Sequence, residues 1–427
     1  MDATTTFEVL KAAARSTGIW DGAQQTTHAF LLTPDVYRLS PDNQRLLEQF
    51  APALRETLSG IGRIAAIAED RGLARGPAWT RVRRLLAVGV PHVYRDIALL
   101  QPSTGPTLCK VDFMERRDGS LCVAEIDGHN KHGMGYSTLG VVLKNALQPN
   151  LPGYKGVARV LAEEVRALGT DRLVLLSGHH ERFYLPEFAI IARAVERYGV
   201  QMTVVEELDL PAIDEHILEP SKQGRVLLVD FPFLSRSTHL NELLPRAYRE
   251  GRIHFLFQPK PFLGSKAVLG LVRNEEQDPA LEAILRSQIH PRALEAIRSV
   301  IPPTYLMGKA AKKMDWKELA TKGGWVIKNA ISNGMKGMAF PGDRAYDTFL
   351  NRAAQSYDHA VLQQIVETRA HRLRSFTSAG EEQTGDWYLR ITAHVTRTGI
   401  ADLALTARQD RSVHGAKDSL LFGAAFA

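Results

Sequence analysis

The chain of 427 residues has little cysteine and no long apolar run. Its two cysteines, Cys109 and Cys122, fall on what we predict below to be opposite strands of one hairpin, out of register with each other. This excludes a disulfide framework, and two thiols alone leave a zinc site without enough ligands. The stretch 1–20 has no apolar segment as long as a signal peptide or a membrane span. We therefore expect a cytoplasmic protein with free thiols that does not bind membranes.

A strong charge of one sign is also lacking. The formal net charge is +6, and the basic residues are scattered without interleaved aromatic residues. This argues against a nucleic-acid-binding surface. Hydrophobic residues make up 44% of the chain and charged residues 23%, which is typical of a globular protein. The length favours two or three lobes, each with a core of its own.

The pattern of apolar residues divides the chain into four regions. Residues 1–104 are predicted to be helical, because apolar residues recur there at three- and four-residue spacing. Residues 105–154 contain a hairpin followed by a polar loop. Residues 155–300 alternate between helix and strand, which predicts a small parallel sheet with crossover helices. Residues 301–427 mix strands with helices.

The predicted hairpin gathers acidic residues on one face. Two alternating runs, TLCKVDFMER and SLCVAEID, flank an Asp-Gly dipeptide, which is typical of a two-residue turn. Such a turn places Asp112 opposite Glu125, and Lys110 opposite Asp127. Side chains alternate along a strand, so all four would share one face of the sheet. Gathered carboxylates indicate a magnesium site, because Mg²⁺ takes oxygen ligands and keeps waters and phosphates; an exposed surface with one Lys–Asp pair is the structural alternative.

A polar segment with three glycines, GHNKHGMGYS, follows the acidic strand directly. This is where a loop that binds an anion or a substrate would lie, and it favours the metal-site interpretation of the hairpin. A second polar turn, SGHHER, follows the first strand of the predicted parallel sheet. Ligands bind at that end of the strands in open α/β sheets. Its histidines and Glu181 are candidates for selecting a substrate, or for an ordinary surface turn.

A lysine followed by a glycine-rich loop marks a candidate nucleotide site. The run WVIK predicts a strand that ends on Lys328, and the loop 329–337 leads into a second short strand. Glycine-rich loops let backbone N–H groups approach phosphate oxygens, and a nearby lysine adds charge. No GxxxxGK[ST] motif occurs, so this is not a Walker A loop. The next predicted strand supplies candidates for backbone contacts to an adenine edge: Gln363, Gln364 and Val366.

These stretches resemble parts of the eukaryotic-type glutathione synthetases. KVDFMERRDGSLCVAEIDGHN is similar to that family's Asp-Gly-Ser turn followed by Glu-Ile-Asn and a substrate loop. FLGSKAVLGLV, WVIKNAISNGMKG, AVLQQIV and ALTARQDRSVHGAKDSLLFGAAF resemble, in the same order, its Gly-Thr-Lys segment, its lysine strand with a glycine-rich loop, its adenine hinge and its arginine-bearing C-terminal strand. The acidic strand precedes the lysines, as in circularly permuted ATP-grasp proteins such as glutathionylspermidine synthetases. The resemblance covers about residues 105–427.

The resemblance implies a fold of mixed α+β and α/β type, ATP-grasp and circularly permuted, with residues 155–300 as the substrate domain. It also implies that ATP and Mg²⁺ are the cofactors. Glu125 and Asp127 would bind magnesium, with Asp112 on the same face. The residues expected to contact the nucleotide are Lys266, Lys328, Asn333, Gly334, Gly337, Gln363, Gln364 and Val366.

Three basic residues would act on the substrates in this resemblance. Lys110 stands where the family has an arginine near the substrate carboxylate, and Arg408, with Arg390, would stabilise the transferred phosphoryl group. A lysine cannot make the arginine's bidentate contact, so we expect the substrate to differ from that of glutathione synthetase. The family also has a metal-binding glutamate in the glycine-rich loop, where this chain has Ser-Asn. We expect Asp127 or Asn333 to compensate.

Together these features predict an ATP-dependent carboxylate–amine ligase. The γ-phosphoryl group would move to a carboxylate, and an amine would attack the resulting acylphosphate. The expected partners are two small-molecule substrates, a carboxylic acid and an amine. Because proteins of the family that the chain resembles are often dimeric, a homodimer is also expected. An ATP-binding regulatory protein of the same fold is the first alternative. A sugar- or amino-acid-binding protein built on 155–300 is the second, and polyamine conjugation is an alternative at the level of the substrate.

Overall fold

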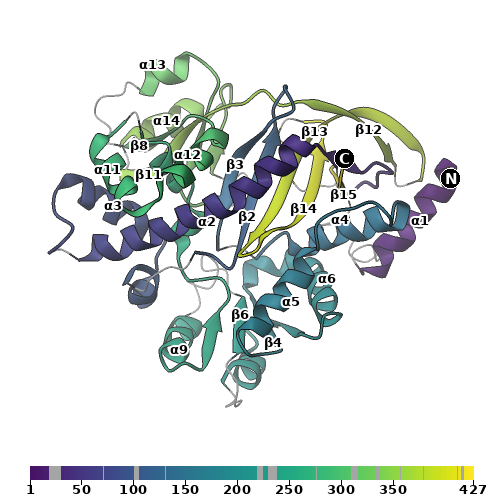
Figure 1. Ribbon diagram of the computed structural model, residues 1–427, viewed down its shortest axis with the longest axis horizontal. Coiled ribbons are helices and arrows are strands. Elements are labelled where there is room, and N and C mark those ends of the chain that lie inside the picture. The colour runs from purple at the N-terminus through teal and green to yellow at the C-terminus, as the bar shows by residue number, and fades with distance from the viewer. Residues whose placement is uncertain are drawn as a thin grey trace.

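The computed structural model describes residues 1–18, 30–70, 72–100, 105–129, 131–218, 225–228, 238–275, 277–308, 316–332, 337–355, 357–377, 379–410, 412–414 and 418–427. Within these ranges, three sheets and the helices around them form a mixed α/β molecule (Figure 1). None of the described helices is long and apolar enough to cross a membrane.

The largest sheet has seven strands in the order β1-β15-β14-β13-β2-β3, with β12 paired to β13. All its pairs are antiparallel except β1 with β15. We call it the core sheet. Its strands are β1 (Tyr37–Leu39), β2 (Leu108–Glu115), β3 (Leu121–Asp127), β12 (Ala370–Phe376), β13 (Glu382–Thr396), β14 (Gly399–Arg408) and β15 (Leu420–Phe426).

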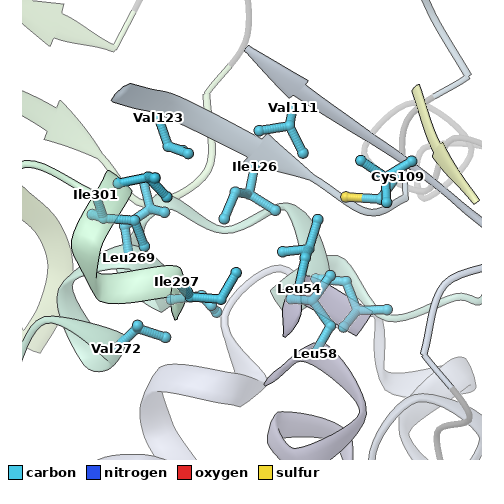
Figure 2. Packing of buried hydrophobic residues seen from close by; sticks show 14 of the residues in the cluster. Leu54, Leu58, Cys109, Val111, Val123, Ile126, Leu269, Val272, Ile297 and Ile301 are labelled. Atoms are coloured by element: carbon cyan, nitrogen blue, oxygen red, sulfur yellow. The ribbon is translucent and has the colours of Figure 1, made fainter. Parts of the chain in front are cut away.

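One face of the core sheet is apolar and lies under the long helix α2 (Pro41–Glu69), which crosses it diagonally (Figure 1). Helix α2 begins where the Ser40 side chain accepts the backbone N–H of Asn43, with Pro41 in the first turn. Helices α10 (Lys266–Val272) and α12 (Pro291–Val300) pack into the same cluster. Figure 2 shows side chains from α2, α10 and α12 meeting those of β2 and β3.

The opposite face of the core sheet is polar. Directly opposed residues of antiparallel strands share a face, and the register pairs Lys110 with Asp127 and His394, and Asp112 with Glu125 and Thr392. The same row continues onto β14. The charged, hydroxyl and imidazole side chains on this face are Lys110, Asp112, Glu125, Asp127, Arg390, Thr392, His394, Asp402, Thr406 and Arg408.

The predicted parallel sheet is confirmed, with four strands in the order β5-β4-β6-β7 and every pair parallel. Its strands are β4 (Arg172–Ser177), β5 (Gln201–Glu206), β6 (Arg225–Leu228) and β7 (Ile253–Phe255). Its helices include α5 (Val157–Ala167), α6 (Leu185–Glu196), the short α7 (Leu210–Ile213) and α9 (Thr238–Arg249). Helix α4 (Met134–Leu147) lies between this unit and β15 of the core sheet.

A third sheet of four strands has the order β10-β9-β11-β8 and is antiparallel. Its strands are β8 (Thr304–Gly308), β9 (Trp325–Asn329), β10 (Met338–Ala339) and β11 (Tyr357–Gln364). Trp316 of α13 (Trp316–Thr321) and Leu350 of α14 (Tyr346–Gln355) pack against this sheet.

The predicted boundaries at 104 and 300 differ from the packing in two respects. The N-terminal region holds helices α1 (Ala3–Ser16), α2 and α3 (Pro77–Ala87), as expected, but also contributes β1 to the core sheet. Residues 262–300, assigned by sequence to the α/β unit, instead contribute α10, α11 (Pro279–Gln288) and α12 to the cluster around α2. The short helices η2 (His92–Tyr94), η3 (Asp96–Leu100), η4 (His179–Tyr184), η5 (Asp214–Leu218) and η6 (Pro261–Gly264) complete the described elements.

Candidate functional site

The β2–β3 hairpin has the predicted residue pairs but a different turn. Arg116 donates its N–H to the carbonyl of Ser120 at 2.8 Å, which leaves three residues in the loop and not the expected two. Gly119 supplies the positive φ, at 86°. The extra loop residue shifts the strand pairing by one position, and a bulge at Ala124 restores it. Val123 faces Phe113 before the bulge, and Glu125 faces Asp112 after it.

The bulge turns the carbonyl of Ala124 toward β9, where it accepts a hydrogen bond from Lys328 Nζ at 3.0 Å. Lys328 Nζ also donates to Gln363 Oε1 at 2.6 Å, and Gln363 Nε2 donates to Thr304 Oγ1 at 3.1 Å. The lysine is 5% exposed. Burial lowers the pKa of Lys328 to about 8, although the nearby Glu125 carboxylate opposes that shift.

Lys266 begins α10 and is 3% exposed. Its Nζ lies 2.8 Å from Glu125 Oε1 and 2.8 Å from the carbonyl oxygen of Ser332. Its backbone N–H donates to the Ala330 carbonyl at 2.7 Å. Lys266 therefore joins the acidic strand β3 to the segment that follows β9.

Asp112 is held by two groups from β13. Thr392 Oγ1 donates to Asp112 Oδ1 at 2.6 Å, and Arg390 Nη1 lies 3.9 Å from Oδ2. Burial by itself would raise the pKa of Asp112, but Arg390, Lys110 and the Thr392 hydroxyl together hold it below the usual value. Asp112 is therefore a carboxylate at neutral pH.

Lys110 and Asp127 form the far end of the acidic row. Lys110 Nζ is 3.9 Å from Asp127 Oδ2, and His129 Nδ1 is 3.2 Å from Oδ1. Burial alone would lower the pKa of Lys110, but the carboxylates of Asp112, Asp127 and Glu125 outweigh it and raise the pKa above its usual value. Lys110 is therefore charged throughout the physiological range.

A cavity of about 550 Å³ opens beside the hairpin bulge. Its lining includes charged side chains from β2, β3, α10, β9 and β13, namely Asp112, Glu125, Lys266, Lys328 and Arg390. It also includes apolar side chains, among them Met114, Val326, Met338, Phe340 and Ile365. A lining of both kinds suits a ligand with an anionic part and a flat apolar part.

The strand predicted to meet an adenine edge borders the cavity. The backbone N–H groups of Gln364 and Ile365 donate to the carbonyls of Pro303 and Gly324 at 2.8 and 2.6 Å. The N–H of Val366, the next residue, has no hydrogen-bond partner in the described part of the chain. Val366 lines the cavity, so its backbone donor is available to a ligand there.

Several predicted residues lie away from this cavity. Arg408 does not line it; the guanidinium binds the Ser412 carbonyl at 2.9 Å and Asp418 Oδ2 at 2.6 Å. It therefore fixes the segment after β14, whose residues 412–414 border the cavity. Gly337 accepts the Asn329 N–H at 2.7 Å through its carbonyl. Asn333 and Gly334 fall outside the described residues, and Lys110 and Asp127 continue the same sheet face beyond the cavity lining.

The carboxylates fit a magnesium ion that keeps other ligands. Among the described residues, no group of three or more histidine, cysteine, aspartate and glutamate side chains is placed to hold a metal. Asp112 and Glu125, however, both border the cavity from adjacent strands. Mg²⁺ is commonly held by one or two carboxylates together with waters and substrate phosphates. The donor set is therefore suitable for Mg²⁺ in company with a polyphosphate.

Three contributors to this site were missed by sequence reasoning. Thr392 could have been found, because it lies two positions from Arg390 on one strand and so shares its face. The carbonyls of Ala124 and Ser332 could not, since backbone acceptors carry no residue signature. The bulge that exposes Ala124 follows from the length of the turn, which the Asp-Gly signal predicted wrongly.

No protein-family model and no curated protein sequence matches the chain. Among solved structures, the chain is similar to a glutathione synthetase-like effector from Globodera pallida in its apo form, with a TM-score of 0.55, 13% identity and coverage of 100% of this chain and 98% of that one. A Methylobacillus flagellatus protein provisionally named gamma-glutamylcysteine synthetase is matched at a TM-score of 0.34, 11% identity, 89% of this chain and 88% of that one. A TM-score of 0.34 is too low to support an inference about the fold of this chain. The first gives the chain a glutathione synthetase-like fold.

Proposed function

We propose that the chain is an ATP- and Mg²⁺-dependent ligase of the ATP-grasp type, circularly permuted, that joins a small carboxylic acid to an amine. The observation that carries this proposal is the convergence of Lys266, Lys328, Arg390, Asp112 and Glu125 around one cavity whose lining is otherwise partly apolar. They come from five elements: β2, β3, α10, β9 and β13. Two lysines, an arginine and two carboxylates suit a metal-bound polyphosphate, and the apolar side chains of the lining suit a purine.

The proposed nucleotide pose follows from the available groups. The backbone N–H of Val366 would donate to the base, between Met338 and Ile365. Lys266 and Lys328 would neutralise phosphate oxygens. In the ligand-free chain both ammonium groups already have protein acceptors, Glu125 for Lys266 and Gln363 for Lys328. Binding of a polyphosphate would exchange or share these contacts.

Magnesium would be held by Asp112 and Glu125, and it would supply charge neutralisation across the phosphates. Asp127, further along the same face, stays a candidate ligand. Arg390 lies beside Asp112, 3.9 Å from its carboxylate, and would stabilise charge on the transferred group. Lys110 would orient the substrate carboxylate for attack on the γ-phosphorus. Arg408 would act through the segment 412–414, which it holds against the cavity.

In this mechanism the substrate carboxylate oxygen attacks the γ-phosphorus, and ADP leaves. The amine nitrogen then forms a bond to the acyl carbon, the C–O bond to phosphate breaks, and the amine loses a proton. The protein's part is positioning and charge neutralisation, which suits a site made of lysine, arginine and carboxylate without a nucleophilic side chain.

The test is ADP release with ATP, Mg²⁺, a panel of carboxylic acids including amino acids, and hydroxylamine as a general acceptor. Hydroxylamine intercepts an acylphosphate as a hydroxamate and needs no specific amine site. We expect ADP and hydroxamate to appear together with one class of acid. Glu125→Ala and Lys328→Ala should each abolish both products. Turnover that persisted in either variant would contradict the proposed ligase site.

An ATP-binding regulatory protein is the second candidate. It is favoured by the lack of a three-residue metal cluster in the described residues. It predicts ATP binding that depends on Lys266 and Lys328, but no ADP release with any acid and hydroxylamine. The homodimer expected from the sequence stays a separate prediction, which a sedimentation measurement would test.

A further inference from the structure

The N-terminus of α4 meets α6 and the polar face of the core sheet at Gly133. The Gly133 N–H donates to Glu187 Oε1 on α6. There is no room for a side chain at Gly135, where a Cβ would stand 2.2 Å from the Glu187 carbonyl oxygen. The two helices are therefore in backbone contact here. On the other side, a Cβ on Gly133 would stand 3.6 Å from Lys110 Cδ and 3.9 Å from His394 Nε2.

Glu187 is a fully buried carboxylate, with an exposed fraction of 0%. The positive charges of His132 and Lys110 act on it from a distance. Its Oε2 atom has no hydrogen-bond partner among the described residues, and no cationic side chain in them forms an ion pair with it. The nearest cationic groups have other carboxylates: His132 Nε2 lies 2.9 Å from Glu181, and Lys110 faces Asp127. Burial raises the pKa of Glu187 to about 6, so it is still mostly ionised at neutral pH.

A buried carboxylate in this state is costly. Buried charges in proteins are normally paired or fully hydrogen-bonded, because desolvation is otherwise uncompensated. The backbone N–H groups of Gly133 and Gly135 at the start of α4 stabilise the Glu187 carboxylate, and a glutamine oxygen would serve that purpose equally well. Among the described residues no ion pair neutralises the remaining charge, so a ligand cation would complete its neutralisation.

His394 presents a second unsatisfied atom to the same place. Its Nδ1 lies 2.7 Å from Asp402 Oδ1, while Asp402 Oδ2 accepts the N–H of Val157 at 2.8 Å. A carboxylate can only accept, so Nδ1 carries a proton, and in the neutral form of such an imidazole Nε2 is an acceptor. That atom is buried and has no partner in the part of the chain that the structure describes.

We propose that this junction binds the ammonium group of the amine substrate, with Glu187 as its counter-ion and His394 Nε2 as a second acceptor. The inference rests on the proposed ligase function and assigns the amine subsite of that ligase. An ammonium group supplies one positive charge and several N–H donors, which is what two acceptors with one uncompensated negative charge require.

The position of the junction agrees with this role. Lys110, at the end of the acidic row, adjoins the junction, and it lies two residues along β2 from Asp112 on the same face. Tyr184, three residues before Glu187, is close enough to Lys110 and Arg390 for their charges to act on its hydroxyl. An amine held at Glu187 would therefore adjoin the carboxylate that Lys110 orients.

The experiment compares two acceptors in Glu187→Gln. This variant keeps the acceptor for the Gly133 N–H and removes only the charge. With the acid found in the hydroxylamine screen, we expect the KM for its primary-amine substrate to rise by at least about tenfold, while the hydroxylamine-dependent rate and the KM for the acid stay unchanged. Hydroxylamine is uncharged at neutral pH and needs no counter-ion.

Glu207→Gln is the matched control. Glu207 is also a buried carboxylate with one unpartnered oxygen among the described residues, and its other oxygen accepts the His179 N–H at 2.7 Å. It follows β5, on the parallel sheet, so the amine KM should not change. An unchanged amine KM in Glu187→Gln, or a raised KM for the acid, overturns the proposal. A wild-type chain inactive with both acceptors refutes instead the ligase function itself.

Discussion

Lys328 is a residue of the candidate site whose charge state can change near physiological pH. Its pKa is lowered to about 8 by burial in the ligand-free chain. A bound phosphate favours the protonated lysine and therefore raises that pKa. ATP affinity should be level below pH 8 and fall as the pH rises above it, by up to about tenfold per pH unit. Titration calorimetry with a non-hydrolysable ATP analogue would measure this.

Lys328→Arg supplies the control for that titration. Arginine stays protonated over the whole range, so its affinity, whatever its starting value, should not fall with rising pH. If the wild type and Lys328→Arg have parallel profiles, Lys328 is not the group that meets the phosphate.

Glu125 should govern the magnesium requirement. Glu125→Gln keeps an oxygen acceptor for Lys266 but removes the charge that favours a divalent cation. We expect the half-saturating Mg²⁺ concentration for turnover to rise by about tenfold or more, since losing one ligand charge costs about 1.4 kcal/mol or above. Glu367→Gln is the control, because Glu367 also borders the cavity but pairs with Arg117 on the surface. Equal effects in the two variants would contradict the assignment.

The register of the acidic residues could be predicted from sequence, and the partners of other residues could not. Lys110 faces Asp127 as expected because strand alternation and hairpin pairing are local rules. The longer turn shifts the strand pairing by one residue, and the bulge at Ala124 shifts it back. The predicted residue pairs are therefore present although the predicted turn type is wrong. Glu187 and His394 come from distant segments, and only the folded chain brings them to Gly133.

At the scale of elements, the contact between α4 and α6 depends on Gly135. A Cβ at this position would stand 2.2 Å from a backbone oxygen of α6, which cannot move aside as a side chain would. Gly135→Ala should lower the free energy of unfolding by about 1–3 kcal/mol or more, as other overpacking substitutions do. Urea unfolding measures this.

The comparison for Gly135→Ala is Gly153→Ala. A Cβ on Gly153 would meet the Ala424 carbonyl oxygen at 3.5 Å, an ordinary contact. Its free energy of unfolding should stay within about 0.5 kcal/mol of wild type. A tolerated Gly135→Ala would mean that α4 and α6 can separate at low cost, and that the Glu187 junction is looser than described.

Elements with strong periodicity were predictable, and edge elements were not. The parallel sheet followed from alternating helices and apolar strands, as the register of β4, β5 and β6 confirms. Strand β1 has only three residues and pairs with the last strand of the chain. Nothing local in so short a segment indicates a partner nearly 400 residues away.

At the scale of the whole molecule, nucleotide binding should couple the core sheet to the third sheet. Lys266 and Lys328 already connect β3 to the β9 region through Glu125, Ser332 and Ala124. A ligand at 100 times its dissociation constant adds about 2.7 kcal/mol to the free energy of unfolding. Mg²⁺ with a non-hydrolysable ATP analogue should therefore raise the melting temperature of the wild type.

Lys266→Ala should lose that ligand-induced increase, measured against its own ligand-free melting temperature. Lys322→Ala is the control, because Lys322 is an exposed residue after α13 that forms an ion pair with Glu318. A full increase in Lys266→Ala would show that the nucleotide binds elsewhere.

The motifs indicated a glutathione synthetase-like fold, and the likeness to the Globodera pallida effector supports that coarse statement. The motifs did not indicate which segments pack into which lobe. Residues 262–300 look like a continuation of the α/β unit but pack with α2. That packing brings Lys266 beside Glu125. It depends on the burial of apolar side chains such as Leu269 and Ile297 (Figure 2). No local sequence pattern indicates which lobe these side chains join.

The most direct test of the account follows the oxygen atoms. The acid that supports hydroxylamine-dependent ADP release is labelled with ¹⁸O in its carboxylate, turned over with ATP, Mg²⁺ and an amine, and the released phosphate is analysed by mass spectrometry. Transfer through an acylphosphate predicts one ¹⁸O in each phosphate formed. Phosphate without the label, at a rate equal to that of ADP release, would contradict the proposed ligase mechanism.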